Sequence, residues 1–340
     1  MTISKYLTYP SFYHPDRVRE VYRVPYQQRA LEAKLWQEQH QINPAFQDRR
    51  KIGLLLIDVQ NTFCLPEFEL FVAGTSGNGA VEDNVRLCEF IYRHLGAITE
   101  ILPTMDTHTA VQIFHSIFWV NEAQQHPEPG TTITLAEVEE GKWQINPQLQ
   151  SGLSQNIEQL RQHALHYVQK LSDEDKYPLT IWPYHSMVGG IGHALVSAVE
   201  EAIFFHSLAR QSPTKFELKG SNPLTENYSV LSPEVLDTAD GKAIARQNTS
   251  LVQKLLAFDV LIIAGQAKSH CVAWTIENLL TEIQAVDPNL AQKIYLLEDC
   301  MSPVVIPGVI DFSEQAEETF EKFAAAGMKI VKSTELFNHN

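Results

Sequence analysis

The sequence contains few cysteines, few positive charges and no long apolar segment. Its four cysteines include no CxxC pair, which argues against a zinc ribbon and against a disulfide framework. The formal net charge of −15 disfavours binding to the phosphate backbone of a nucleic acid. No apolar run approaches the roughly 20 residues that a membrane-spanning helix needs, and no signal-peptide pattern follows Met1. We therefore expect a cytoplasmic protein that binds neither nucleic acid nor membrane.

Apolar segments of strand length alternate with helical patterns along most of the chain. The composition, with 44% hydrophobic residues, is that of a globular protein. The predicted strands lie near residues 52–58, 98–106, 216–219, 259–265, 293–298 and 328–332. The predicted helices between them lie near residues 81–95, 192–208, 271–286 and 313–326. This alternation predicts an α/β fold with a mostly parallel sheet that helices cover on both faces.

Three of the predicted strands lead into a chemically reactive residue. Asp58 directly follows the apolar run that ends at Ile57, and Lys219 ends the short third strand. Cys271 comes where an apolar strand leads into a helix that begins near Ser269. In open α/β sheets, ligands bind outside the carboxyl ends of the strands. We therefore expect Asp58, Lys219 and Cys271 to share one crevice.

These three residue types suit nucleophilic catalysis. Unpaired N–H groups and the dipole at a helix start lower the pKa of a thiol, so we expect Cys271 to form a thiolate readily. A carboxylate such as Asp58 could take the thiol proton, and an ammonium such as Lys219 could stabilise the thiolate. The alternatives are ordinary: a cysteine that only packs a helix on the sheet, a capping aspartate and a solvated lysine. The coincidence of three strand ends favours catalysis.

The motifs around these residues resemble those of the isochorismatase-like cysteine hydrolases, and the nicotinamidases most closely. The stretch LLIDVQNTFC at 55–64 is similar to the opening strand motif of that family. KGSNP at 219–223, followed by Tyr228 and Ser229, resembles the lysine segment, and GQAKSHCV at 265–272 resembles the nucleophile turn. The resemblance implies a Rossmann-like three-layer α/β/α sandwich.

The resemblance also implies roles for individual residues. Asp58, Lys219 and Cys271 would form the catalytic triad. The peptide bond between Gln266 and Ala267 would be the non-proline cis bond of the family. The backbone N–H groups of Ala267 and Cys271 would form the oxyanion hole.

A metal site is indicated by Asp106 and His108, which can supply an oxygen and an imidazole to one ion. The segment 182–190 resembles the nicotinamidase segment that carries the distal histidine, which makes His185 the third expected ligand. Three ligands leave positions open for water or substrate, as in catalytic zinc sites. We expect a divalent ion, zinc first, with iron and manganese as alternatives. His115 is a further candidate ligand, although its surroundings also read as an apolar strand.

Departures from the family pattern limit the substrate prediction. Thr107 and Thr109 stand where nicotinamidases have an aromatic residue and a proline, and 268–270 replaces the residues that usually precede the nucleophile. We predict a cysteine-dependent amidohydrolase that releases ammonia from a small amide, like the nicotinamidases. The alternatives are another hydrolase of the superfamily, acting on a ureidoacrylate, carbamoyl or other small amide, and a non-catalytic binding protein on the same fold.

The chain is longer than the core of this family, and we place the excess in two segments. Residues 1–50 form a predicted helical arm, with a helix near 26–41, that packs on its own core or on a neighbouring subunit of a homo-oligomer. The hydrolase domain would span 51–340, with an insert at about 121–177. The insert combines a polar run with a predicted helix near 156–171. Because it separates the proposed metal ligands in sequence, we expect it to act as a lid.

Overall fold

A six-stranded parallel sheet forms the centre of the protein. The computed structural model describes residues 7–150, 152–153, 156–306, 308 and 310–335. The strand order is β12-β9-β8-β1-β2-β7, and every neighbouring pair is parallel. The strands are β1 (Ile52–Ile57), β2 (Glu100–Asp106), β7 (Glu217–Lys219), β8 (Val260–Gly265), β9 (Ile294–Leu297) and β12 (Lys329–Val331). Each lies within a predicted strand, so the predicted fold class is confirmed.

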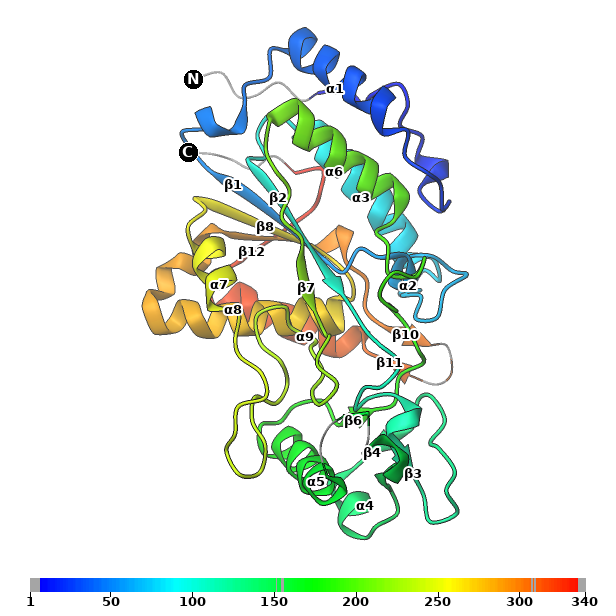
Figure 1. The fold of residues 1–340 in the computed structure, drawn as a ribbon. Coiled ribbons are helices and arrows are strands. Elements are labelled where there is room, and N and C mark those ends of the chain that lie inside the picture. Colours follow the sequence, from blue (N-terminus) through cyan, green and yellow to red (C-terminus); the bar gives the residue numbers. More distant parts are fainter. Residues whose placement is uncertain (1–6, 151, 154–155, 307, 309, 336–340) are drawn as a thin grey trace.

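Two helical layers cover the sheet (Figure 1). One layer consists of α3 (Gly79–Arg93) and α6 (Ser197–Arg210), with α1 (Tyr26–His40) packed on α6. The other layer consists of α7 (Thr249–Leu256), α8 (Ala273–Val286) and α9 (Ser313–Ala325). The central strand β1 shows why both layers form. Leu54 and Leu56 face the first layer, and Leu55 and Ile57 face the second, because successive strand side chains point to opposite faces.

The N-terminal arm lies on its own chain. Arg29 of α1 is buried and pairs with Glu201 of α6 at 2.6 Å. Tyr22 also donates to the Glu201 carboxylate at 2.7 Å, and the Arg29 guanidinium lies over the Phe12 ring. The arm therefore contacts the first helical layer through a buried charge pair.

The segment from Val111 to Ile181 forms a small unit beyond the carboxyl ends of the strands (Figure 1). Its elements are β3 (Trp119–Val120), β4 (Thr132–Ile133), α4 (Leu135–Glu139), β5 (Gln144–Ile145), α5 (Ile157–Asp173) and β6 (Leu179–Thr180). The polar run at 124–150 reads as a loop from the sequence, yet it contains β4, α4 and β5. Ile133, Trp143 and Ile145 anchor these short elements in the core of the unit.

Several smaller elements differ from expectation. The helix expected from residue 192 begins at Ser197, and α7 is not predicted from the sequence. A π-helical turn at Lys268–Val272 precedes α8. The remaining elements are α2 (Asn61–Cys64), the hairpin β10 (Val305–Ile306) and β11 (Ile310–Asp311), and 3₁₀ turns at Pro15–Arg17, Ala45–Gln47, Ser116–Phe118, Pro147–Leu149, Pro288–Lys293 and Glu298–Cys300. Within the described residues, no helix combines the length and apolarity needed to cross a bilayer.

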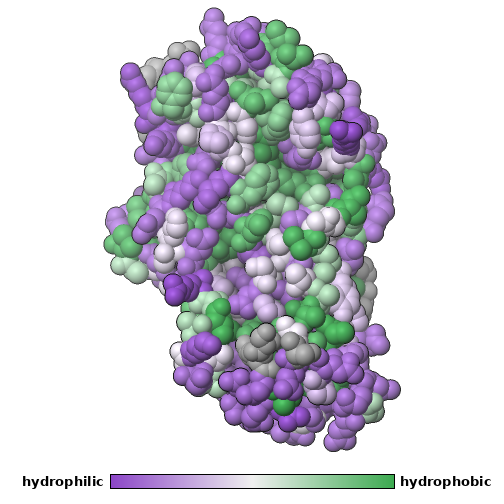
Figure 2. Space-filling model, in the orientation of Figure 1, coloured by the Kyte–Doolittle hydropathy of each residue, from purple (hydrophilic) through white to green (hydrophobic). Residues whose placement is uncertain are grey.

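Exposed apolar side chains gather at one edge of the sheet. Figure 2 shows hydrophobic residues across the middle of one face, over the region of β7 and α6, while the end that carries α4 and α5 is mainly hydrophilic. Phe216 and Leu218, next to or within the edge strand β7, are 44% and 61% exposed. The homo-oligomer expected from the sequence remains a prediction.

Candidate active site

The structure brings Asp58, Lys219 and Cys271 together at the carboxyl edge of the sheet. Asp58 follows β1, Lys219 ends β7, and Cys271 lies on the π-helical turn after β8. The Lys219 Nζ atom lies 3.0 Å from the Asp58 carboxylate and donates to the Cys271 Sγ atom at 3.7 Å. All three side chains are buried. A carboxylate, an ammonium and a thiol thus share one site shielded from solvent.

Special backbone conformations position the ends of β1 and β8. Asp58 has a φ of 48°, which is uncommon for a residue other than glycine. Gly265 has a φ of 126°, and a Cβ atom there would lie 2.1 Å from the Ile57 carbonyl oxygen. Only glycine permits this approach of the two strand ends. The following peptide bond, between Gln266 and Ala267, is cis, which is the conformation that the family resemblance implied.

Asp58 lies in surroundings that make it a proton acceptor. The Thr104 hydroxyl donates to the Asp58 Oδ1 atom at 2.6 Å and fixes the carboxylate. Burial, followed by the charge of Asp106, raises the pKa of Asp58, and the Lys219 ammonium opposes this shift. A carboxylate with a raised pKa holds a transferred proton more firmly than an exposed aspartate does.

The Cys271 thiol differs from expectation. We expected the helix start to lower its pKa, but the structure raises the pKa of Cys271 well above its usual value. Burial is the largest cause, and the negative charges of Asp58 and Asp106 add to it, while Lys219 opposes them. These surroundings favour the protonated thiol over the thiolate.

Lys219 connects the thiol to the proposed metal ligands. Its Nζ atom donates to Asp106 Oδ1 at 2.9 Å and to the Asn227 carbonyl at 2.8 Å, in addition to its contacts with Asp58 and Cys271. Burial alone would favour the neutral amine, but the charges of Asp106 and Asp58 outweigh it and raise the pKa of Lys219 well above its usual value. Lys219 stays charged, which compensates the two buried carboxylates.

Asp106, His108 and His185 form a cluster whose ligand atoms lie within 4.8 Å of one another. The His108 Nδ1 atom lies 2.9 Å from the Gly220 carbonyl, and the His185 Nδ1 atom lies 2.8 Å from the Pro183 carbonyl. A carbonyl oxygen can only accept, so each Nδ1 carries the proton. Each Nε2 lone pair then faces Asp106 Oδ2, at 2.6 Å from His108 and 3.4 Å from His185.

This arrangement fits a divalent cation. Nitrogen lone pairs that converge on a carboxylate repel it unless a proton or a cation lies between them. In addition, metal-binding histidines commonly donate their other ring N–H to a carbonyl oxygen, as His108 and His185 do here. Burial lowers the pKa of His185. Burial alone would raise the pKa of the Asp106 carboxyl, but neighbouring positive charge, including that of Lys219, holds this pKa well below the usual range. An ionised carboxylate and neutral imidazoles are the forms that bind metal.

His115 lies beside the cluster. Its ring centroid is 6.1 Å from the rings of both His108 and His185. Its Nδ1 atom faces the Ala110 carbonyl at 3.2 Å, and its buried Nε2 atom has no hydrogen-bond partner among the residues that the structure describes. Burial, with the two neighbouring histidines, lowers the pKa of His115 to about 3. The strand expected at 113–116 is absent; His115 makes a single bridge to Trp182 instead.

Two residues that the sequence reasoning did not select support this cluster. Gly220 has a φ of 83°, and a Cβ atom there would lie 2.5 Å from a carbon of the His108 ring. Gln60 accepts from the Asp106 backbone N–H at 2.8 Å and donates to the Asp106 carbonyl at 2.8 Å. Both lie inside the recognised motifs, which is the signal that could have identified them.

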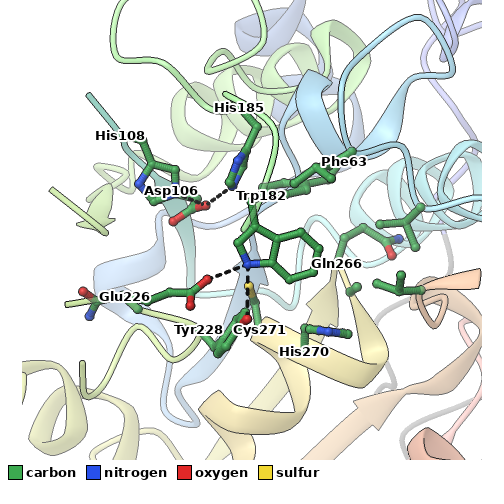
Figure 3. A pocket seen from close by; sticks show the side chains of 15 residues that line it. Phe63, Asp106, His108, Trp182, His185, Glu226, Tyr228, Gln266, His270 and Cys271 are labelled. Atoms are coloured by element: carbon green, nitrogen blue, oxygen red, sulfur yellow. Dashed lines mark hydrogen bonds and ion pairs between the residues drawn. The ribbon is translucent and has the colours of Figure 1, made fainter. Parts of the chain in front are cut away.

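A pocket with about 580 Å³ of empty space opens onto the thiol (Figure 3). Its lining comprises Phe63, Leu70, Val72, Asp106, His108, Trp182, His185, Glu226, Asn227, Tyr228, Gln266, Ala267, His270, Cys271 and Val304. Among the residues that the structure describes, none from 121–177 lines the pocket, so the expected lid is not seen there. Tyr177 instead supports the nucleophile turn from behind, because its hydroxyl donates to the Ser269 carbonyl at 2.8 Å.

Comparisons with known proteins support the fold. No family model matches the chain, and no curated protein does. The yeast nicotinamidase structure covers 82% of this chain over 99% of its own length, with 17% identity and a TM-score of 0.50. The chain has the fold of the nicotinamidases.

Two further solved structures show similar relationships. The yeast nicotinamidase bound to the inhibitor nicotinaldehyde covers 83% of this chain and 99% of its own, with 16% identity and a TM-score of 0.50. The nicotinamidase and pyrazinamidase of Acinetobacter baumanii covers 85% and 99%, with 17% identity and a TM-score of 0.49. The fold implied by the sequence resemblance is confirmed by the sheet topology and by the two yeast structures.

Proposed function

We propose that the protein is a cysteine-dependent amidohydrolase of the nicotinamidase type, which releases ammonia from a small amide. One observation carries the proposal. The Lys219 ammonium lies 3.0 Å from the Asp58 carboxylate and 3.7 Å from the Cys271 sulfur, at the floor of a pocket. The nicotinamidase fold of the chain supports the same reading.

Acylation begins with a proton transfer, because the raised pKa of Cys271 keeps the thiol protonated at rest. Asp58 takes the thiol proton as the sulfur attacks the amide carbonyl carbon. The backbone N–H groups of Ala267 and Cys271 would donate to the developing oxyanion, an interaction worth roughly 3–4 kcal/mol per donor in other enzymes. Asp58 then gives its proton to the nitrogen, ammonia leaves, and a thioester remains on Cys271.

Deacylation repeats these steps with water. Asp58 takes a proton from a water molecule as its oxygen attacks the thioester carbon. The intermediate collapses, the carbon–sulfur bond breaks, and the sulfur regains a proton from Asp58. Lys219 stays protonated throughout and stabilises the negative charge that alternates between Asp58 and Cys271.

Asp106, His108 and His185 would hold a divalent ion, with His115 as a candidate fourth ligand. When bound there, the ion would supply a Lewis acid that orients a donor atom of the substrate. Nitrogen-rich mixed ligation favours zinc or iron over magnesium. Asp106 links this group to the triad, because its other carboxylate oxygen accepts from Lys219.

Ammonia release tests the proposal. The purified protein is offered nicotinamide, pyrazinamide, a ureidoacrylate and N-carbamoyl amino acids, and ammonia is measured enzymatically. We expect turnover of at least one small amide, and its loss in Cys271→Ala. Cys88→Ala is the matched control, because Cys88 is a buried thiol of α3 outside the pocket. Equal turnover by Cys271→Ala and wild type would contradict the covalent mechanism.

A further inference from the structure

Glu226 is a buried carboxyl group in the pocket that the triad and the metal cluster do not use. It is 7% exposed, and its Oε1 atom accepts from the Trp182 indole N–H at 2.8 Å (Figure 3). Within the part of the chain that the structure describes, its carboxylate forms no ion pair with a lysine or arginine. Burial, with the charge of Glu234, raises the pKa of Glu226 well above its usual value. Buried carboxylates are normally paired with a cation, and a bound cation would supply that partner and favour the ionised form of Glu226.

The rest of the pocket lining, as far as the structure describes it, also lacks a positively charged lysine or arginine. It contains two acidic side chains, Asp106 and Glu226, and no lysine or arginine. Phe63, Trp182 and Tyr228 add aromatic rings around the same space. A carboxylate beside aromatic rings is a suitable environment for an organic cation, which gains a charge-assisted hydrogen bond and contact with the ring faces.

The backbone of Glu226 is held on both sides. Its N–H donates to the Tyr167 hydroxyl at 3.3 Å, and its carbonyl accepts from the Glu234 N–H at 2.8 Å. Tyr167 belongs to α5, far away in sequence, and is fully buried. The position of the carboxylate is therefore set before a ligand binds, which lowers the entropic cost of recognition.

We propose that Glu226 selects amide substrates that carry a positively charged group, such as an ammonium or a guanidinium. The cation would lie against the Glu226 carboxylate and the Trp182 ring, and the amide carbon would lie at Cys271. This inference rests on the proposed amidase function and adds a substrate class to it. Glu226 is then a specificity-determining residue, because it contacts the substrate away from the reacting bond.

Matched pairs of amides test the inference on the wild-type protein. The pairs are 4-aminobutanamide with pentanamide and 3-(aminomethyl)benzamide with 3-ethylbenzamide, which differ by a charged amine against an alkyl group of similar size. We expect kcat/KM to be about 10- to 100-fold higher for the cationic member, which corresponds to one hydrogen bond to a charged group. Equal or better hydrolysis of the neutral members would overturn the proposal without any variant.

Glu226→Gln keeps the size of the side chain and removes its charge. We expect the preference for the cationic member to fall by about 10- to 100-fold, chiefly through KM. Glu234→Gln is the control, since it removes the same charge from the same loop but Glu234 does not line the pocket. An unchanged preference in Glu226→Gln, or an equal loss in Glu234→Gln, would overturn the assignment to Glu226.

Calorimetric binding to Cys271→Ala separates the inference from the proposed function. This variant cannot turn over its ligand, so 4-aminobutanamide and pentanamide are compared as ligands alone. If no amide is hydrolysed by the wild type but the cation binds and the binding is lost with Glu226→Gln, the amidase proposal fails and the cation site stands. If hydrolysis occurs but 4-aminobutanamide binds no better than pentanamide, the amidase proposal stands and the cation site is wrong.

Discussion

At Cys271, burial and two carboxylates outweigh the helix start. Burial is the main cause that raises the pKa of the thiol, Asp58 and Asp106 add to it, and Lys219 opposes them. In the proposed mechanism, the Cys271 thiol becomes nucleophilic when Asp58 takes its proton, after the substrate has bound. This differs from cysteine enzymes that keep a preformed thiolate next to a cationic group.

Replacing Asp58 should have two opposite effects: faster labelling of Cys271 and slower release of ammonia. Asp58→Asn removes a charge that raises the pKa of the thiol, so the thiolate population at pH 7 increases and labelling of Cys271 by iodoacetamide becomes faster. Ammonia release falls at the same time, by roughly 10⁴-fold, because the base is lost. Labelling is followed by mass spectrometry, with Cys271→Ala as the blank. Slower labelling in Asp58→Asn would show that Asp58 does not raise the pKa of the thiol.

Glu234 makes stability depend on pH. Burial is the main cause that raises the pKa of Glu234 to about 7, against the opposing charge of Lys176. The folded state binds this proton more tightly than the unfolded state, so the free energy of unfolding decreases as pH rises from about 4.5 to 7. The loss is about 3 kcal/mol. Urea unfolding at pH 5 and pH 8 should show a smaller difference for Glu234→Gln than for wild type, and an identical difference would contradict the assignment.

The histidine cluster predicts metal content. Protein purified without chelators should contain about one equivalent of a divalent metal, most of it lost in His108→Ala, because that imidazole is one of only a few ligands. His166→Ala is the control, since His166 pairs with Asp237 outside the cluster. Elemental analysis reports the content. Equal metal in wild type and His108→Ala would place the ion elsewhere.

At the scale of elements, α5 and the residues just after it hold a loop of the pocket in place, although no residue of α5 lines the pocket. The Tyr167 hydroxyl accepts from the Glu226 N–H, His163 contacts the Leu224 carbonyl at 2.8 Å, and Lys176 donates to the Glu234 carbonyl. The loop that carries Glu226 and the Lys219 partner Asn227 is thus fixed by the inserted unit. The inserted unit thus holds the loop on the Glu226 side of the pocket, although its residues lie away from Cys271.

Tyr167→Phe tests this support. The change leaves the Glu226 N–H without its partner inside the protein, at a cost of about 1–3 kcal/mol, and lets the loop shift. We expect KM to rise several-fold while kcat changes less, because Tyr167 positions a binding residue and touches no reacting atom. Tyr13→Phe is the matched control: it removes a hydroxyl of the arm that donates to the Val85 carbonyl of α3. A KM effect of the same size in Tyr13→Phe would mean that general destabilisation is the cause.

Much of the fold follows from short-range patterns in the sequence. Strands such as β1 and β8 are predicted because their residues are buried on both faces and form unbroken apolar runs. Asp58 is found because it directly follows such a run, Cys271 because it lies in the turn after one, and Lys219 because it ends a short predicted strand. Within the insert, the helix α5 is predicted near residues 156–171 from its periodicity, whereas two-residue strands such as β3 are missed because they carry no periodicity of their own.

Pocket features that depend on distant contacts are not predictable in this way. Glu226 is selected by its contact with Trp182 and by the support of Tyr167, and these residues are separated by 44 and 59 positions in the chain. The thiol pKa of Cys271 was wrongly predicted because it is a sum over burial and several charges. A local helix start is only one part of that sum.

At the scale of the whole molecule, the chain stacks three units on one another: the arm, the sheet with its helices, and the inserted unit (Figure 1). The arm meets the helical layer away from the pocket, whereas the insert meets the loops of the pocket. Changes in the arm should therefore alter stability and leave specificity unchanged, whereas changes in the insert should alter specificity as well.

Arg29 tests this separation. Arg29→Ala leaves Glu201 buried without its cation, which should lower the free energy of unfolding by about 3–5 kcal/mol. The double variant Arg29→Met, Glu201→Met removes both charges and should recover most of the loss, because apolar side chains of similar volume replace a buried pair at little cost. Urea unfolding measures stability, and kcat/KM per folded molecule should stay at the wild-type value in all three proteins. A changed ratio between cationic and neutral amides in Arg29→Ala would show that the arm communicates with the pocket.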